Sequence, residues 1–323
     1  MAKKKLRIGV LFGGKSAEHE VSLRSAENII KALNKERYQI TLIKINKDGH
    51  FDFNKIKSFD LIFPVLHGPF GEDGTVQGLL KLADIPFVGA SVLGSAVGMD
   101  KDIMKKLLRD AGLSIGKFIT LGYGEKITFE KAKKTLGVPM FIKPSNMGSS
   151  VGVSKVKNKK EFEKAIKEAF LFDTKVIIEA FIKGREIECS VLGNDKPTAS
   201  IPGEVIVNDE FYSYETKYIN EDGAFIQIPA KISKKKIKNV QEASIKAYKA
   251  LSCEGFGRVD SFLKENGEVV INEINTIPGF TSISMYPKLW EASGLPLPKL
   301  LDKLIALAVE RFNREKKLRT SVI

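Results

Sequence analysis

The N-terminal part of the chain alternates between short apolar runs and segments whose apolar residues recur at helical spacing. Residues 6–12, 38–45 and 59–66 are typical of buried strands, whereas residues 20–33 and 75–83 have helical periodicity. Strands that alternate with helices predict a mainly parallel, open sheet. In such sheets, ligands bind beyond the carboxyl ends of the strands.

From about residue 99 the pattern changes to a short module of α+β type. Strands are expected at 138–143 and 176–179, and a helix at 159–170. Residues 145–152 form a loop that is rich in glycine and serine. The fold class is therefore α/β, with an α+β arrangement in this part of the chain.

A third block begins near residue 184. It contains the expected strands 186–192, 256–263 and 268–274, a long helix at 233–251 and terminal helices at 290–293 and 298–312. The polar, tyrosine-rich stretch 206–228 is predicted to be a loop, and loops of this length are usually functional. The chain is thus divided into three units, at residues 1–98, 99–183 and 184–323.

The composition is that of a globular protein, with 43% hydrophobic and 28% charged residues among 323. No apolar run approaches the roughly 20 residues of a membrane-spanning helix, and the first apolar run is too short for a secretory signal, so we expect a cytoplasmic protein without membrane contact. Two cysteines and three scattered histidines lack the spacing of a zinc site.

The formal net charge of +13 admits a nucleic-acid partner or an anionic small substrate. The lysines are spread along the chain, often beside glutamates, and the runs at 3–5 and 234–236 contain no interleaved aromatic residues. A solvated, lysine-rich surface therefore explains the charge better than nucleic-acid binding does, and no nucleic-acid partner is expected.

Neither a GxxxxGK[ST] loop nor a GxGxxG sequence after a strand is present. A nucleotide would therefore have to be held in another way. Residues 148–152 offer small side chains and consecutive backbone N–H groups, which can close over phosphates. An ordinary flexible hairpin loop is the alternative interpretation.

The strongest chemical signal is a pair of polar strands around Asn266-Gly267. If these two residues form a two-residue hairpin turn, Asp260 lies opposite Glu273, and Arg258 lies opposite Asn275. All four side chains then share one face, where two facing carboxylates and an amide oxygen favour Mg²⁺ or Mn²⁺. A solvent-facing polar strand is the alternative, and a longer turn would change the register.

Two residues near expected strand ends are further candidates. Glu18 follows the first strand and is suited to binding a substrate ammonium group, or it is an acid in the first turn of a helix, where the macrodipole favours it. His67 follows the strand at 59–66, although a lone histidine is more often structural.

Taken together, these motifs closely resemble the D-alanine–D-alanine ligase family of the ATP-grasp superfamily. The matching stretches follow the family order from residue 9 to about residue 287. They are residues 13–22, 67–78, 99–101, 143–152, 214–218, 257–260 and 272–282.

The resemblance implies a three-domain ATP-grasp fold. Residues 1–98 would form an N-terminal Rossmann-like domain, residues 99–183 the central ATP-grasp subdomain, and residues 184–323 a C-terminal subdomain with the metal and substrate site. The implied reaction is ATP-dependent joining of two D-alanines through a D-alanyl phosphate, for peptidoglycan synthesis. A D-alanine–D-lactate ligase is the nearest alternative, and a basic nucleic-acid-binding protein is a distant one.

The resemblance also assigns residues. The implied ATP-binding residues are Lys101, Lys143, Ser150, Glu179, Ala180, Phe181, Ile182, Glu186 and Lys217. The implied ligands of two Mg²⁺ or Mn²⁺ ions are Asp260, Glu273 and Asn275. The implied catalytic residues are the trio Glu18, Ser149 and Tyr218, with Arg258 and the Gly279 N–H as oxyanion donors.

His67, Ser284 and Met285 would bind the two D-alanines, and a cytoplasmic homodimer is implied. Two departures from the family pattern are present. Asn146-Met147 replaces a charged pair in the glycine–serine loop, which could alter loop closure, and Ile277 occupies a variable position.

Overall fold

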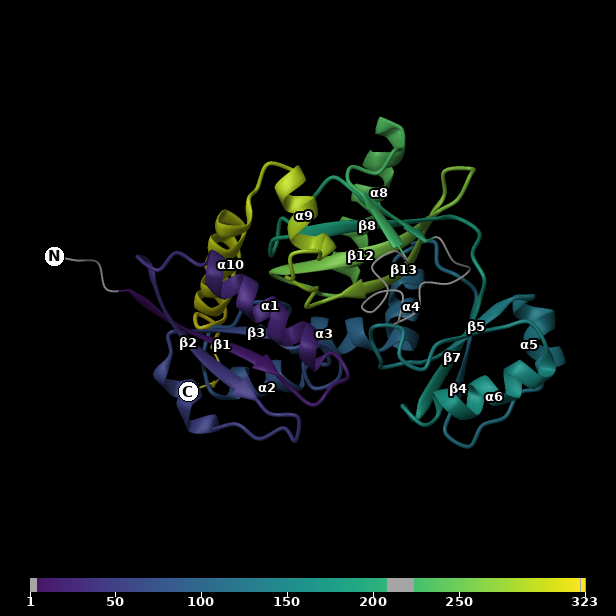
Figure 1. The fold of residues 1–323 in the computed structure, drawn as a ribbon, viewed down its shortest axis with the longest axis horizontal. Coiled ribbons are helices and arrows are strands. Elements are labelled where there is room, and N and C mark those ends of the chain that lie inside the picture. The colour runs from purple at the N-terminus through teal and green to yellow at the C-terminus, as the bar shows by residue number, and fades with distance from the viewer. Residues whose placement is uncertain (1–4, 208–223, 320, 323) are drawn as a thin grey trace.

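The computed structural model describes residues 5–207, 224–319 and 321–322. Three sheets follow one another along the chain, and Figure 1 shows the first and the second at opposite ends of the molecule. The N-terminal sheet has the order β2-β1-β3 and is parallel, as predicted. Its strands are β1 (Leu6–Gly13), β2 (Tyr38–Ile45) and β3 (Leu61–Val65).

Helices cover both faces of this parallel sheet. Helix α1 (His19–Ala32) and the C-terminal helix α10 (Leu297–Glu315) share one core cluster with β1 and β3. The 3₁₀ helix η1 (Phe53–Ser58) and helix α2 (Thr75–Leu82) pack on the other face. The end of the chain thus returns to the N-terminal sheet, which ties the first and third units together.

The middle sheet is antiparallel, with the order β4-β7-β5-β6. Two amphipathic helices, α5 (Phe129–Leu136) and α6 (Lys159–Ala169), bury their apolar sides in one core cluster with it. The strands are β4 (Phe118–Gly122), β5 (Met140–Pro144), β6 (Ser154–Val156) and β7 (Lys175–Ala180).

The C-terminal sheet is also antiparallel, with the order β11-β10-β8-β12-β13, and β9 pairs with β8. Helix α8 (Lys234–Ala250) and helix α4 (Lys101–Asp110) pack against it in one core cluster, and helix α9 (Met285–Ala292) contacts β8. The strands are β8 (Arg185–Leu192), β9 (Thr198–Ala199), β10 (Gly203–Val207), β11 (Ala224–Gln227), β12 (Phe256–Leu263) and β13 (Val269–Asn275).

Several predicted boundaries were wrong. Residues 206–207 and 224–227, expected in a loop, belong to paired strands β10 and β11, while residues 208–223 lie outside the described part of the chain. Helix α9 begins at Met285 rather than at 290, because Pro287 in its first turn is compatible with a helix. Helix α3 (Val92–Met99) was not predicted, since it has no charged residue to mark an exposed face.

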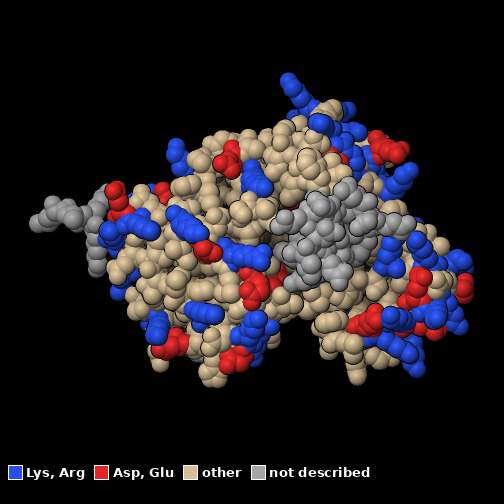
Figure 2. Space-filling view, viewed as in Figure 1, with Lys and Arg blue, Asp and Glu red and all other residues tan. Residues whose placement is uncertain are grey.

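Lysines and arginines are spread over the face shown in Figure 2, with acidic residues among them. This distribution agrees with a solvated surface and not with a single basic stripe. Among the described residues, no helix is long and apolar enough to cross a membrane.

Candidate active site

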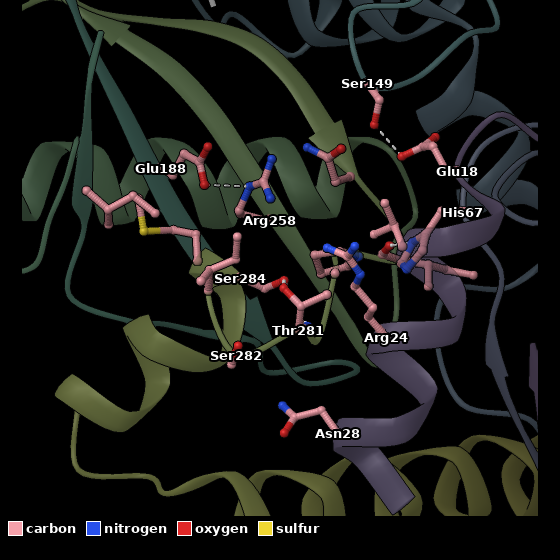
Figure 3. Close-up of a pocket in the computed structure, with 18 of the residues that line it drawn as sticks. Glu18, Arg24, Asn28, His67, Ser149, Glu188, Arg258, Thr281, Ser282 and Ser284 are labelled. Carbon is pink, nitrogen blue, oxygen red and sulfur yellow. Dashed lines mark hydrogen bonds and ion pairs between the residues drawn. The ribbon is translucent and has the colours of Figure 1, made fainter. Parts of the chain in front are cut away.

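A cavity of about 500 Å³ lies where α1, the glycine–serine loop (residues 145–152) and the C-terminal sheet meet. Figure 3 shows side chains from all three regions pointing toward it. The cavity is lined by nine of the predicted site residues, which are Glu18, His67, Ser149, Arg258, Glu273, Asn275, Gly279, Ser284 and Met285.

The β12–β13 hairpin pairs Asp260 with Glu273, and Arg258 with Asn275, as predicted. The predicted two-residue turn is wrong, however. The Lys264 N–H donates to the Glu268 carbonyl, which leaves a three-residue loop with Gly267 at φ +87°. A bulge between Asp260 and Ser261 shifts the register back by one residue. This shift compensates for the extra residue in the turn, and the pairs Asp260–Glu273 and Arg258–Asn275 are therefore those predicted.

Arg258 connects the acidic side chains on this face. Its Nε lies 2.8 Å from Glu188 Oε2, and its Nη2 lies 2.7 Å from Asp260 Oδ2. The Asn275 amide donates to Asp260 Oδ2 at 2.9 Å. Asp260 and Glu188 are buried, so the guanidinium supplies the positive charge that offsets their desolvation.

Asp260, Glu273 and Asn275 fit a magnesium site by the chemistry of their donor atoms. Two carboxylates and an amide share one face of the paired strands, where Glu273 and Asn275 line the cavity and Asp260 is not among its lining residues. No cluster of three or more His, Cys, Asp or Glu suited to a metal occurs among the described residues. Water and phosphate oxygens would therefore complete the coordination of the ion, and Mg²⁺ is usually bound in this way.

Three lysines gather beside this face. Lys143 and Lys105 lie 2.7 and 2.9 Å from the Glu179 carboxylate, and Lys101 lies 3.7 Å from Glu273. Burial alone would raise the pKa of Glu179, but the ion pairs with Lys105 and Lys143 lower it to about 2. With more lysines than carboxylates in direct contact, this region favours a bound polyanion.

The glycine–serine loop is closed onto Glu18. The Ser149 hydroxyl donates to Glu18 Oε1, and a Cβ on Gly148 would lie only 2.8 Å from Glu18 Oε2. Ser149 and Ser150 both have positive φ, at 49° and 60°, which strains residues other than glycine. Loop closure therefore depends on specific contacts, and the Glu18–Ser149 bond is one of them.

The unusual pair Asn146-Met147 has its own contacts. The Asn146 backbone N–H and side-chain amide donate to Asp173 at 2.7 and 3.0 Å, and the Met147 carbonyl accepts from Lys101 Nζ at 2.6 Å. Asp173 thus fixes the start of the loop. Tyr218, the third member of the predicted trio, lies outside the described residues, as does Lys217.

His67 is buried beside Glu18. Because a carbonyl only accepts, its Nδ1 donates to the Ile277 carbonyl at 2.9 Å, and its Nε2 lies 3.4 Å from Ser25 Oγ. Burial lowers the pKa of His67, although the Glu18 charge opposes this shift. The ring is therefore neutral near pH 7.

Ser284 and Gly279 are adjacent in the cavity wall. Ser284 precedes α9, and its hydroxyl accepts the Thr281 N–H at 3.0 Å. A Cβ on Gly279 would lie 2.8 Å from Ser284 Oγ, so only glycine fits without displacing this serine. Met285 is buried beside them.

The remaining predicted nucleotide residues lie at and beyond the end of β7. Ala180 pairs with Met140 of β5, and Phe181 is 46% exposed with its ring centroid 6.3 Å from that of Phe141. Ile182 follows it, and Glu186 pairs with Val205 across the neighbouring strands. A partly exposed ring pair beside the lysine cluster can hold a flat base.

Three residues at this site were missed from the sequence. Lys105 is one helical turn after Lys101, and Glu188 is two residues after Glu186 on the same strand face, so periodicity could have identified both. Glu72 lies within the matched motif 67–78. Burial raises its pKa to about 8, and the Glu18 charge adds to the shift.

Profiles of two sequence families match the chain. The D-ala D-ala ligase N-terminus matches residues 7–58 and 51–90, and the D-ala D-ala ligase C-terminus matches residues 107–306. The chain belongs to the D-alanine–D-alanine ligase family. D-alanine–D-alanine ligase of Oceanobacillus iheyensis is 48% identical over 98% of this chain and 99% of the relative. D-alanine–D-alanine ligase A of Escherichia coli K12 is 47% identical over 98% of this chain and 100% of the relative.

Solved structures of the D-alanine–D-alanine ligase family have the same fold. The enzyme from Coxiella burnetii superposes with a TM-score of 0.87 at 38% identity, covering 97% of this chain and 96% of that one. The Bacillus anthracis ligase complexed with ATP superposes with a TM-score of 0.83 at 34% identity, covering 96% of this chain and 99% of that one. VanG D-Ala:D-Ser ligase from Enterococcus faecalis superposes with a TM-score of 0.86 at 40% identity, covering 94% of this chain and 100% of that one.

Membership of the D-alanine–D-alanine ligase family confirms the predicted α/β ATP-grasp fold and the predicted class of enzyme, a ligase that joins D-amino acids. The D-alanine–D-lactate alternative is not favoured by these relatives, and neither is a nucleic-acid-binding protein.

Proposed function

We propose that the chain joins two D-alanines to D-alanyl-D-alanine with conversion of ATP to ADP and phosphate, for peptidoglycan precursor synthesis. The observation that carries this proposal is the shared cavity. Arg258, Glu273 and Asn275 of the hairpin line the same space as Glu18, Ser149 and Gly279. Groups suited to phosphoryl transfer and groups suited to an amino acid thus face each other.

In this proposal, residues 99–183 and 184–323 hold ATP between them, and residues 1–98 supply the first D-alanine site. Lys101, Lys143 and Lys217 bind the phosphates, with Ser150 and the glycine–serine loop above them. The base lies along Glu179, Ala180, Phe181 and Ile182, and Glu186 binds the ribose. The ion pairs of both lysines support this, because Lys101 is held toward Glu273 of the hairpin and Lys143 toward Glu179 of β7.

Asp260, Glu273 and Asn275 would hold two Mg²⁺ or Mn²⁺ ions. Such ions supply charge neutralisation of the phosphates during transfer. The facing register of Asp260 and Glu273 supports this assignment, because it places two hard carboxylate ligands opposite one another on one strand face.

In the first step, a carboxylate oxygen of the first D-alanine attacks the γ-phosphorus of ATP. A new O–P bond forms, the bond to the bridging oxygen breaks, and ADP leaves. The product is D-alanyl phosphate. Glu18 binds the ammonium group of this substrate with His67 beside it, and the neutral ring of His67 does not repel that ammonium.

In the second step, the amine of the second D-alanine attacks the acyl carbon. The ammonium loses one proton before attack and a second as the tetrahedral intermediate collapses, and phosphate leaves with its electron pair. Arg258 and the Gly279 N–H stabilise the intermediate oxyanion. Ser284 and Met285 bind the second carboxylate, and Tyr218, tied to Ser149 and Glu18, orients the amine.

The protein is proposed to act as a cytoplasmic homodimer, where ATP is available. Support for the dimer comes from the outer face of α2 and α3, where Leu82 and Leu93 are 90% and 58% exposed and α3 has no charged residue. A second copy would bury this face. Leu93→Glu should give a monomer in light-scattering chromatography if the interface is there.

The test of function is a product assay with ATP and Mg²⁺, using D-alanine alone and with D-lactate or D-serine as competing acceptors. The proposal predicts phosphate release that requires D-alanine, with D-alanyl-D-alanine as the main product at pH 7.5. A main product containing D-lactate or D-serine would contradict it.

A further inference from the structure

The backbone that carries Gly279 is held from one side by the N-terminal unit. Both backbone polar groups of Ile277, the N–H and the carbonyl, are hydrogen-bonded to this unit. Its N–H donates to Glu72 Oε1 at 3.1 Å, and its carbonyl accepts from His67 at 2.9 Å. Both side chains belong to the segment that follows β3, and both are buried.

Phe280, on the other side of Gly279, is bound in the same manner. Its N–H donates to Ser25 Oγ at 3.1 Å, and its carbonyl accepts from the Asn28 amide at 2.7 Å. Ser25 and Asn28 are three residues apart on α1 and therefore share a face. We name Ser25, Asn28, His67 and Glu72 the backbone clamp.

Between Ile277 and Phe280, the Gly279 N–H is the remaining backbone donor. Pro278 has none, and the Thr281 N–H donates to Ser284 Oγ. No described residue accepts the Gly279 N–H, although Gly279 lines the cavity. An N–H that is unbonded within a fixed backbone and beside a cavity is a preorganised donor for an anionic oxygen.

Glu72 has a second contact that makes the clamp rigid. Its Oε2 accepts the Gly68 N–H at 2.8 Å, so one carboxyl group joins the loop after β3 to the loop after β13. Both oxygens of a carboxyl group can accept whether or not it carries a proton. A carboxamide cannot, because its NH₂ would face one of the two donors.

We propose that the backbone clamp consists of positioning residues which direct the Gly279 N–H toward the oxyanion that forms on the acyl carbon during peptide-bond formation. This inference rests on the proposed function. Ser25 and Glu72 act through the backbone of 277–280, not on the substrate, so their loss should reduce turnover more than it changes ATP binding. A misplacement of about 1 Å in such a site can cost on the order of 100-fold in rate.

The test compares Glu72→Gln and Ser25→Ala with a matched control, Asp73→Asn. Asp73 accepts two N–H groups in the same turn, from Phe70 and Thr75, but makes no hydrogen bond to 277–280 among the described residues. Ser25→Ala deletes a single hydroxyl and keeps the helix, so it remains informative if Glu72→Gln folds poorly. For each variant, kcat, KM for ATP and the affinity for a phosphinate analogue of the tetrahedral intermediate are measured.

The clamp predicts a fall in kcat of about 10- to 100-fold for both clamp variants, with analogue affinity weakened by a similar factor and KM for ATP changed less than about twofold. Asp73→Asn should match the parent enzyme. A lower melting temperature with unchanged kcat and analogue affinity would overturn the inference and leave only a structural tie. If the parent enzyme itself makes no D-alanyl-D-alanine, the proposed function fails instead.

Discussion

The Ser149 hydroxyl donates a hydrogen bond to the Glu18 carboxylate, and this contact joins the glycine–serine loop of the middle unit to the start of α1. Both residues line the cavity. The proposed site is therefore closed by a polar contact that one side chain can remove, in a loop whose backbone is already strained at Ser149 and Ser150.

Ser149→Ala should slow turnover by about 10- to 100-fold, because a hydrogen bond to a charged group contributes about 1.5–3 kcal/mol. Hydrogen exchange at residues 148–152 should be faster in the ADP complex of this variant than in that of the parent. Glu18→Gln should slow turnover too, and it should also raise KM for the first D-alanine. Ser149→Ala should leave that KM unchanged. Parent-like exchange and kcat in Ser149→Ala would show that the contact does not govern closure.

Glu273→Gln should reduce kcat by more than about 100-fold while the protein stays folded, because it removes a charge from the proposed metal site. Asp260→Asn should act similarly but also breaks the pair with Arg258. The control is Glu265→Gln in the turn of the same hairpin, where the side chain is exposed. Full activity of Glu273→Gln at saturating Mg²⁺ would contradict the assignment of Glu273 as a metal ligand.

Lys105→Met should destabilise the protein by about 3–5 kcal/mol in urea unfolding, because Glu179 would lose one of its two buried cations. It should also raise KM for ATP, since Lys143 would be drawn more closely to Glu179. Arg109→Met, one turn further along α4 and exposed, is the control. An unchanged free energy of unfolding for Lys105→Met would mean that Lys105 is dispensable.

The buried His67 predicts a pH dependence of stability. Its pKa is lowered in the folded chain, so the unfolded chain binds more protons below about pH 6.5. The free energy of unfolding should therefore fall as pH drops through and below 6.5 and be unaffected by this residue above it. His67→Gln should flatten the dependence, whereas His50→Asn, at an exposed position, should leave it in place.

Local chemistry explains which parts of the fold and site could be predicted. The parallel N-terminal sheet followed from apolar runs alternating with helical periodicity. The Asp260–Glu273 pair was predicted correctly from a turn that is one residue too short, because the bulge at Asp260/Ser261 has no sequence signal strong enough to anticipate it. Helix α3, without charged residues, and the short strand β11 gave no clear periodicity.

The backbone clamp could not have been predicted by the same means. It joins Ser25 to Phe280 and Glu72 to Ile277, pairs that are more than 200 residues apart in sequence. Their proximity depends on the packing of α1 and α10 on one face of the N-terminal sheet. Periodicity describes one element at a time and contains no information on such tertiary contacts.

The central claim is that a carboxylate oxygen of the first D-alanine is transferred to phosphorus before the peptide bond forms. The direct measurement uses D-alanine with ¹⁸O in both carboxylate oxygens, unlabelled ATP and mass analysis of the released phosphate. The account predicts one ¹⁸O in each phosphate ion formed with D-alanyl-D-alanine, and none with the Glu273→Gln variant, which should release almost no phosphate. Unlabelled phosphate released together with the dipeptide would contradict the acyl phosphate pathway.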